Sequence, residues 1–341
     1  MNNERPLFSF LTTAYRTEGY IGQTIDSVLA QTFDDWELVV VDNGNSDEMA
    51  AIVDEYSSLD PRIRLIRQEN RGYRGGVMAA SAAARGEFVC VLDSDDHLLP
   101  GFCERIAKLI ANEPTVDAVC VDAERFSEPD DIDLAVPYMR SIGITTTADP
   151  THRLTFPEVL GGRVPYYTAA IRRTAWDAVG GYDPGIDDAD ESVIIWCRLS
   201  DSFDVRMLPD RLARYRVRAD SLSRDPDKVE SFEQQLMRSF EEGAKASTEP
   251  EHQEILARTL RHLRYHQEIR RARYALLLGD VAVARASAKA AFGQRHTMRA
   301  AVVIAGLTVA PGVMRRMHPS KQWLTDAYSK AKGRATRARR R

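Results

Sequence analysis

The stretch GEFVCVLDSDDHLLP, residues 86–100, decides the fold. Its first part, Phe88–Asp93, is a short apolar run that ends in an acidic residue, which is typical of a buried strand. Leu98-Leu99-Pro100-Gly101 then opens a helix, because proline in the first helical turn costs no hydrogen bond. The stretch therefore predicts a buried strand, a polar loop and a helix in immediate succession.

The same succession recurs through the first 125 residues. The predicted strands are Leu7–Thr13, Leu38–Asp42, Ile63–Arg67, Phe88–Asp93 and Ala118–Asp122. The predicted helices between them are Tyr20–Ala30, Asp47–Leu59, Gly75–Ala84 and Gly101–Asn112. This alternation predicts an α/β fold with a doubly wound, mainly parallel sheet covered by helices. Ligands of such sheets bind at the carboxyl ends of the strands.

The remainder of the chain is organised differently. After a loose acidic stretch we expect a strand at Tyr166–Ile171, a helix around Thr174–Val179, a helix through Leu199, and strands at Val205–Leu208 and Leu212–Val217. Residues 228–293 consist almost entirely of helix formers and predict about three helices. We divide the chain into an α/β domain at 1–225 (halves 1–125 and 126–225), a helical module at 226–311 and a basic tail at 312–341.

The loop Asp93-Ser94-Asp95-Asp96 carries three carboxylates within four residues. One of them is suited to capping the next helix. Three like charges so close together repel one another unless a positive charge lies among them. Mg²⁺ and Mn²⁺ prefer oxygen ligands and combine carboxylates with phosphates, so the loop predicts a metal–diphosphate site.

At this point the sequence resembles a known family. The segments LTTAYRTEGYIGQTIDSVLAQTFDDWELVVVDNGNSD, Asn70-Arg71-Gly72 and ARGEFVCVLDSDDHLLP are similar to those of family 2 glycosyltransferases with the GT-A fold. The resemblance covers residues 6 to 223. It implies a nucleotide-diphosphate sugar donor, most often a UDP-sugar, with Mn²⁺ or Mg²⁺ as cofactor. It further implies transfer with inversion to a saccharide or lipid-linked acceptor in cell-envelope polysaccharide synthesis.

The resemblance also implies roles for individual residues. Thr13 and Tyr15 would line the base and ribose pocket, and Asp42 would accept hydrogen bonds from the base. Asp93 and Asp95 match the DxD motif of the family.

Asp95 and Asp96 are the expected metal ligands of this loop, and Asp93 and Asp95 would also contact the donor. A cation bridging the two phosphates stabilises the negative charge that develops on the departing nucleotide diphosphate.

Two positions depart from the family pattern on the phosphate side. Val77 and Met78 stand where members often carry an Arg-Asn pair, so Arg71 or Arg74 is expected to supply the cation instead. Arg218 stands where a histidine is common; arginine cannot ligate a metal but pairs well with phosphate oxygens.

The catalytic base is the third departure. An inverting transfer needs a carboxylate that accepts the proton of the attacking hydroxyl. Registering the helix VIIWCRL on the family pattern puts Glu191 on the Glu of a Glu-Asp pair and Ser192 where the base should be. Three alternatives stay open: Glu191 is the base, Asp190 is the base, or the base is lost. The last would leave a nucleotide-sugar-binding protein with weakened catalysis.

The formal net charge of −4 is a cancellation, because Gly312–Arg341 carries ten basic residues and one acidic residue. This tail and the apolar Ala300–Met314 before it predict association of Ala300–Arg341 with an anionic membrane surface; a packed helix with a solvated tail is the alternative. No nucleic-acid-binding module accompanies the charge. Four unpaired cysteines and a start without a secretory pattern predict a cytoplasmic protein, with peripheral attachment to the inner membrane face as a variant.

Overall fold

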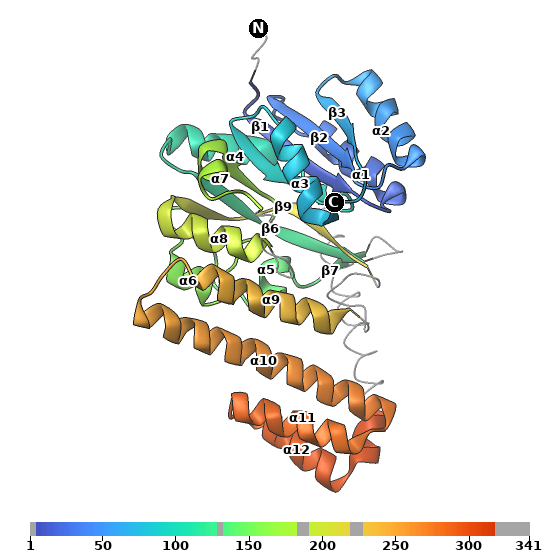
Figure 1. Ribbon diagram of the computed structural model, residues 1–341, viewed down its shortest axis with the longest axis vertical. Coiled ribbons are helices and arrows are strands. Elements are labelled where there is room, and N and C mark those ends of the chain that lie inside the picture. Colours follow the sequence, from blue (N-terminus) through green and yellow to red (C-terminus); the bar gives the residue numbers. More distant parts are fainter. Residues whose placement is uncertain (1–4, 128–131, 183–190, 219–227, 318–341) are drawn as a thin grey trace. The chain divides into compact units, whose positions relative to one another are not determined.

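The computed structural model describes residues 5–127, 132–182, 191–218 and 228–317. The chain forms two compact units. The first comprises Met1–Asp131 and Val136–Val217, and the second comprises Ile132–Ala135 and Arg218–Arg341. Figure 1 shows that the first unit contains a twisted sheet with helices beside it, and that the second is largely helical.

Half of the sheet is parallel, as the sequence predicts. Its strands are β1 (Phe8–Ala14), β2 (Trp36–Asp42), β3 (Ile63–Arg67) and β4 (Phe88–Val91), in the spatial order β3-β2-β1-β4. The helices that follow the first three strands are α1 (Glu18–Leu29), α2 (Asp47–Leu59) and α3 (Gly72–Ala83). Every residue of β1, β2 and β4 is buried, which explains why these strands appear in the sequence as unbroken apolar runs.

The other half of the sheet contains both parallel and antiparallel pairs. Here β8 (Ala169–Arg172) runs antiparallel to β4 and to β6 (Ala118–Ser127). Next to β6 lies the parallel strand β9 (Val205–Val217), and β5 (His97–Leu98) is antiparallel to β9. Antiparallel strands can pair without a helical crossover between them, so β8 can lie between β4 and β6 without such a crossover.

The strand β9 includes both of the strands that the sequence predicts separately at Val205–Leu208 and Leu212–Val217. The turn-like residues around Pro209 predict a break, yet the strand continues for 13 residues. The pairing register with β6 shifts near Cys120 and Asp122, and Pro209 is exposed there. A register shift absorbs extra residues and tolerates a proline, which donates no hydrogen bond to the ladder.

Short helices complete the first unit. They are α4 (Phe102–Asn112), α5 (Tyr138–Ser141), α6 (Phe156–Leu160), α7 (Arg173–Ala178) and α8 (Glu191–Ser202). Helix α7 ends at Gly180 and Gly181, which have φ angles of +82° and +55°. A Cβ atom on Gly181 would lie 2.7 Å from Nε1 of the buried Trp176, so both backbone and packing require glycine there.

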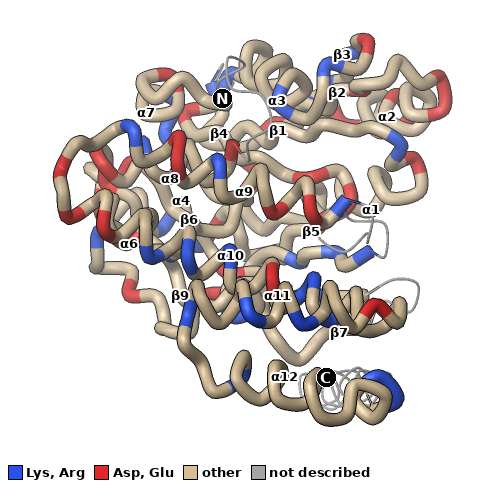
Figure 2. The backbone as a smooth tube through the Cα atoms, turned by 60° about the horizontal axis from the view of Figure 1, so that its bottom comes forward, with Lys and Arg blue, Asp and Glu red and all other residues tan. Residues whose placement is uncertain are grey.

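The second unit contains the short strand β7 (Ile132–Leu134) and four long helices. These are α9 (Val229–Ala244), α10 (Pro250–Leu278), α11 (Val281–Gln294) and α12 (Met298–Val309). Pro250 begins α10, and Gly279, with φ +94°, ends it, as the sequence predicts. Arginines of α10 bind glutamates of α9: Arg270 Nε donates to Glu233 Oε1 over 2.7 Å, and Arg271 binds Glu230. Figure 2 shows both signs of charge along these helices.

None of the described helices is by itself long and apolar enough to cross a membrane. Helix α12 and the following helix Pro311–Met317 satisfy the length and composition criteria only as a pair, and that pair is bent by 116°.

One charged side chain is built into the core of the parallel half. Glu37 on β2 is buried and accepts hydrogen bonds from Ser9 Oγ on β1 over 2.6 Å, from Arg85 Nε over 2.9 Å and from Arg64 Nη2 over 2.9 Å. Burial alone would raise the pKa of Glu37, but the hydrogen bonds from Ser9 and Arg85 and the charge of Arg64 together lower it.

We expect Glu37→Gln to destabilise the protein by about 2–4 kcal/mol at neutral pH, because it leaves buried donors and two arginines without their carboxylate. The lowered pKa means that the ionised carboxylate stabilises the fold above the unfolded-state pKa, and that this contribution is lost as the pH falls through the folded pKa. Urea unfolding below about pH 5 should therefore show a steeper loss for the wild type than for the variant. Glu55→Gln on the exposed face of α2 is the control, and equal stabilities of the two variants would contradict the assignment.

Candidate active site at the carboxyl ends of the parallel strands

The strand order places a switch point beside β1. The chain proceeds from β1 outward to β2 and β3, and then returns to the opposite side of β1 as β4. At such a point the loops after neighbouring strands diverge and leave room for a ligand. The polar residues that follow β1, β2 and β4 therefore meet at one edge of the sheet, as the sequence predicts. Ala14 pairs with Asp42 in the register of β1 and β2.

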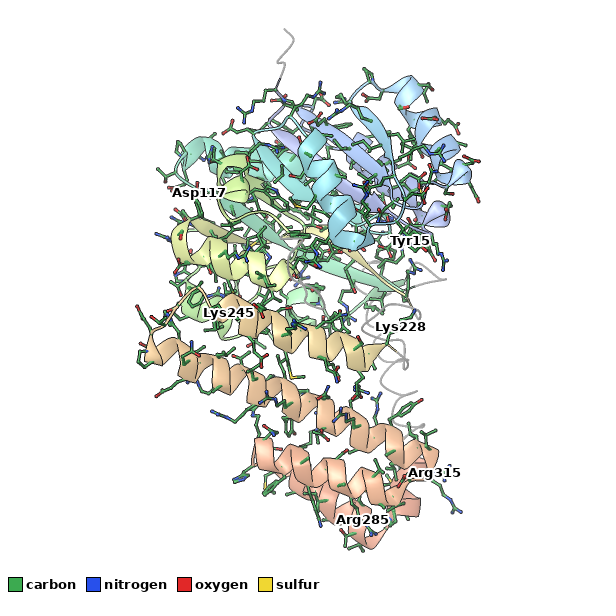
Figure 3. All side chains as sticks on the ribbon, viewed as in Figure 1. Tyr15, Asp117, Lys228, Lys245, Arg285 and Arg315 are labelled. Atoms are coloured by element: carbon green, nitrogen blue, oxygen red, sulfur yellow. The ribbon has the colours of Figure 1, made fainter. Side chains whose placement is uncertain are left out.

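The predicted nucleoside-binding residues lie together at this edge. Tyr15 follows β1, is 42% exposed and projects from the first unit in Figure 3. A Cβ atom on Gly44 would lie 3.0 Å from the Tyr15 ring, so glycine leaves room for the ring against the loop after β2. Asp42 is buried at the end of β2 and accepts hydrogen bonds from Gly44 N and Arg67 Nε, both over 3.3 Å. The arrangement offers an exposed aromatic face beside a buried carboxylate.

Two hydroxyl groups at the end of β1 make no hydrogen bond. Thr12 Oγ1 and Thr13 Oγ1 are buried and have no partner, which is costly for a polar group unless a ligand or water satisfies it. Thr13 packs tightly against α3, because a Cβ atom on Gly76 would lie 2.2 Å from Thr13 Cγ2. The Thr13 hydroxyl is therefore held at the site by close packing rather than by a hydrogen bond.

The acidic loop after β4 is anchored through its last carboxylate. Asp96 is buried; its Oδ2 accepts hydrogen bonds from Tyr166 over 2.6 Å and from Tyr167, and its Oδ1 accepts one from Arg216 N over 2.8 Å. Burial raises the pKa of Asp96 well above its usual range, and repulsion from Asp95 and Asp93 adds to the shift. All the oxygens of this carboxylate are thus engaged by protein donors.

The rest of the loop is held from two helices of the first unit. From α1, Thr17 Oγ1 donates to Ser94 Oγ and Thr24 Oγ1 donates to Asp96 O, both over 2.9 Å. From α3, Tyr73 donates its hydroxyl hydrogen to Asp93 Oδ1 over 2.6 Å. Asp95, between these anchored residues, is only partly buried.

Arg216 on β9 is a central residue of this loop that the sequence reasoning passed over. Its side chain is buried; Nε donates to Asp95 O over 2.6 Å, and Nη2 donates to Gln23 Oε1 over 2.8 Å. The guanidinium also lies 4.6 Å from the centre of the Phe126 ring. Residues 212–217 alternate between apolar and polar residues, and this pattern does not indicate that Arg216 lies on the buried face. Arg216 reaches the acidic loop because β9 pairs with β5.

The carboxyl groups of the acidic loop are suited to a divalent cation that takes most of its ligands from groups outside the protein. Asp93, Asp95 and Asp96 bring three carboxyl groups into this one loop. Among the described residues, no three His, Cys, Asp or Glu side chains are arranged to hold a metal by themselves. Mg²⁺ and Mn²⁺ commonly bind one or two carboxylates and complete their coordination with phosphates and water. Asp95, with Asp93 beside it, supplies such a partial set.

Glu191, one of the two candidate bases, begins α8 and pairs with Arg74 of α3. Arg74 Nε lies 3.0 Å from Glu191 Oε1, and both side chains are mostly buried. The structure thus brings together a predicted phosphate-binding residue and a predicted base. Asp190, the alternative base, lies outside the described residues. Arg218 is described but belongs to the second unit, so its role stays a prediction.

An aromatic group extends from the acidic loop. The Tyr73 ring lies 6.2 Å from that of Tyr182, and the Tyr182 ring lies 5.4 Å from that of Trp176. Trp176 and Tyr182 are buried, so both rings pack in the interior. Tyr73 is the exposed member, and its hydroxyl is bound to Asp93.

Comparison with known proteins finds similar sequences. Residues 9–176 match the model of the family described as Glycosyl transferase family 2. The chain is 35% identical over 138 residues to the "Putative glycosyltransferase EpsH" of Bacillus subtilis, a stretch of 40% of each protein. It is 32% identical over 117 residues to a hyaluronan synthase of Pasteurella multocida, covering 34% of this chain and 12% of that one. These matches therefore span less than half of each relative.

Solved structures share the fold. A crystal structure of TarS from S. aureus in complex with UDP-GlcNAc has a TM-score of 0.59 and 19% identity, covering 87% of this chain and 83% of that one. The mannosyltransferase PcManGT from Pyrobaculum calidifontis, in complex with GDP-Man and Mn²⁺, has a TM-score of 0.59 and 18% identity, covering 97% and 86%.

We expect Arg216→Met to destabilise the protein by about 2–4 kcal/mol, because it removes donors from Asp95 O and Gln23 inside a buried network. The measurement is urea unfolding of the full chain. Arg211→Met is the matched control on the same strand, since Arg211 is exposed and lies 3.7 Å from Asp122. If both variants unfold at the same urea concentration, the loop does not depend on Arg216.

Proposed function

Because this chain belongs to the family 2 glycosyltransferases and has the GT-A fold, we propose that it transfers a sugar from a nucleotide-diphosphate donor to an acceptor hydroxyl with inversion. The acceptor is a saccharide or a lipid-linked saccharide, and the reaction serves polysaccharide synthesis in the cell envelope. The observation that carries the proposal is the anchored acidic loop at the switch point, beside the exposed Tyr15 ring. Similarity to a polysaccharide synthase supports the product class.

The donor's nucleoside occupies the edge at β1 and β2. Tyr15 offers an exposed ring face on which a base can stack, and Asp42 offers carboxylate oxygens to the base N–H groups. The unpaired Thr13 hydroxyl is available to the ribose. We favour a UDP-sugar; the UDP-GlcNAc bound to TarS supports this choice, and the GDP-Man bound to PcManGT defines the alternative.

The diphosphate lies over the acidic loop. Mn²⁺ or Mg²⁺ bound there would neutralise the charge that develops on the leaving nucleotide diphosphate. We assign Asp95 as the metal ligand, with Asp93 near the ribose. Asp96 was an expected second ligand, but its oxygens already accept hydrogen bonds from two tyrosines and a backbone N–H, so we assign it to positioning the loop. Arg218 is a further candidate for contact with the phosphates.

Arg74 links the donor side to the base. In its ion pair, the Glu191 carboxylate is stabilised in its charged form and is therefore a weaker proton acceptor. A diphosphate presents more negative charge than one carboxylate, so it competes for Arg74. Once Arg74 turns to the phosphates, Glu191 is released to accept the proton of the acceptor hydroxyl as that oxygen attacks the anomeric carbon.

A donor-binding protein without transfer is the second candidate function. Ser192 stands at the expected base position, and Glu191 is held by Arg74. In this case Arg74 and Glu191 form a structural ion pair, and the donor would bind without turnover. Measurement of turnover separates the two functions.

We expect Mn²⁺ with the correct nucleotide sugar to raise the melting temperature of the wild type, since a ligand bound only by the folded state stabilises it. A thermal-shift screen of UDP- and GDP-sugars with and without Mn²⁺ measures this. Asp95→Asn should abolish the Mn²⁺-dependent part of the shift, whereas Asp201→Asn, on the exposed surface of α8, should retain it. A full shift in Asp95→Asn would contradict the metal assignment.

We expect Glu191→Gln to leave the donor affinity nearly intact while transfer falls by roughly 10²–10⁴-fold, because the amide cannot accept the proton. The affinity is measured by calorimetry and the transfer by release of the nucleotide diphosphate. Full turnover in this variant would assign the base to Asp190. If the wild type binds the donor but shows no transfer to any acceptor, the binding protein is the correct function.

A further inference from the structure

Helix α12 has two apolar faces, and residues 5–127, 132–182, 191–218 and 228–317, which the structure describes, cover only one of them. The inner face packs against α10 and α11, where Ala300 and Leu307 are buried together with alanines of both helices. Arg285 Nε on α11 donates to Leu307 O over 2.9 Å and fixes the far end of α12 (Figure 3). This packing accounts for the alanine-rich composition of α11.

The outer face of α12 is apolar and exposed. Met298, Val302, Ala305 and Val309 are exposed and follow one another at intervals of four, three and four residues, which places them on a single stripe. Val302 is 62% and Val309 83% exposed. Val313 and Met317, on the following helix Pro311–Met317, are also exposed. We call this set of residues the α12 stripe.

The charged residues within α11, α12 and the helix that follows are all basic. Residues 281–317 contain no aspartate or glutamate and six basic residues: Arg285, Lys289, Arg295, Arg299, Arg315 and Arg316. Figure 2 shows α12 as an almost uncharged segment. Arg315 lies against Gly279 at the turn between α10 and α11, so that end of the unit carries fixed positive charge (Figure 3). The sequence from 318 to 341 adds eight basic residues and one acidic residue.

We propose that the α12 stripe lies on an anionic lipid surface, with its valines and methionines among the acyl chains and the surrounding arginines at the lipid headgroups. An exposed aliphatic helix face flanked by cations is the composition of a segment that binds in the membrane interface. A second copy of this chain would bring the same positive charge to the contact and repel it. The inference goes beyond the proposed transfer reaction, and its test requires no activity.

The test is co-sedimentation of the full chain with vesicles of phosphatidylglycerol and phosphatidylcholine in equal parts, compared with pure phosphatidylcholine. We expect binding to the anionic vesicles only. Val302→Ser with Val309→Ser should weaken binding by about tenfold or more, because two apolar side chains no longer enter the acyl region. Leu59→Ser, at an 81% exposed position on α2, is the matched control and should bind as the wild type does.

Measurements at high salt separate the stripe from the basic tail, since salt screens the attraction of exposed charges to the membrane but not apolar burial. Val302→Glu with Val309→Glu is a second variant and should abolish binding that persists at high salt. Thermal melting identifies any variant that fails to fold. Equal binding of the serine variant and the wild type would overturn the proposal. The proposal would also be overturned if the wild type does not bind anionic vesicles. The same holds if the wild type forms a dimer that dissociates in the serine variant while vesicle binding is unchanged.

Discussion

The buried Asp96 carboxylate is the interaction on which the first unit depends. It lies between β4 and β5 and accepts hydrogen bonds from Tyr166 and Tyr167, just before β8, and from the backbone of Arg216 on β9. A buried carboxyl group is unfavourable unless hydrogen-bond partners surround it, so these segments must stay together for the loop to keep its form. The position of the half-buried Asp95 is a consequence of that arrangement.

Acidic and basic residues gather in different places, both in the proposed site and along the chain. The acidic loop places three carboxyl groups at one edge of the sheet. The positive charge of Arg74 is paired there with the carboxylate of Glu191. Along the sequence, the acidic excess of residues 1–311 and the basic excess of the tail nearly cancel to a net charge of −4. A protein of almost neutral total charge therefore combines an acidic loop in its first unit with last helices, residues 281–317, whose charged residues are all basic.

Much of the first unit was predictable because β1, β2 and β4 are buried on both faces and appear as unbroken apolar runs. The acidic loop was predictable because it follows one of these runs directly. By contrast, β5 has only two residues and no pattern of its own. The direction of β8 depends on its neighbours β4 and β6 rather than on its residues.

The sequence by itself determined which segments form buried strands and helices, and where carboxylates cluster, since both follow from the order of apolar and charged residues. Only the tertiary structure decided what each charged group does. It brings Arg216 to the backbone of Asp95, buries Asp96 among two tyrosine hydroxyls and a backbone N–H, and pairs Glu191 with Arg74. The physical reason is that the role of a charge depends on its distance to groups far away in the chain, and that distance exists only once the sheet has formed.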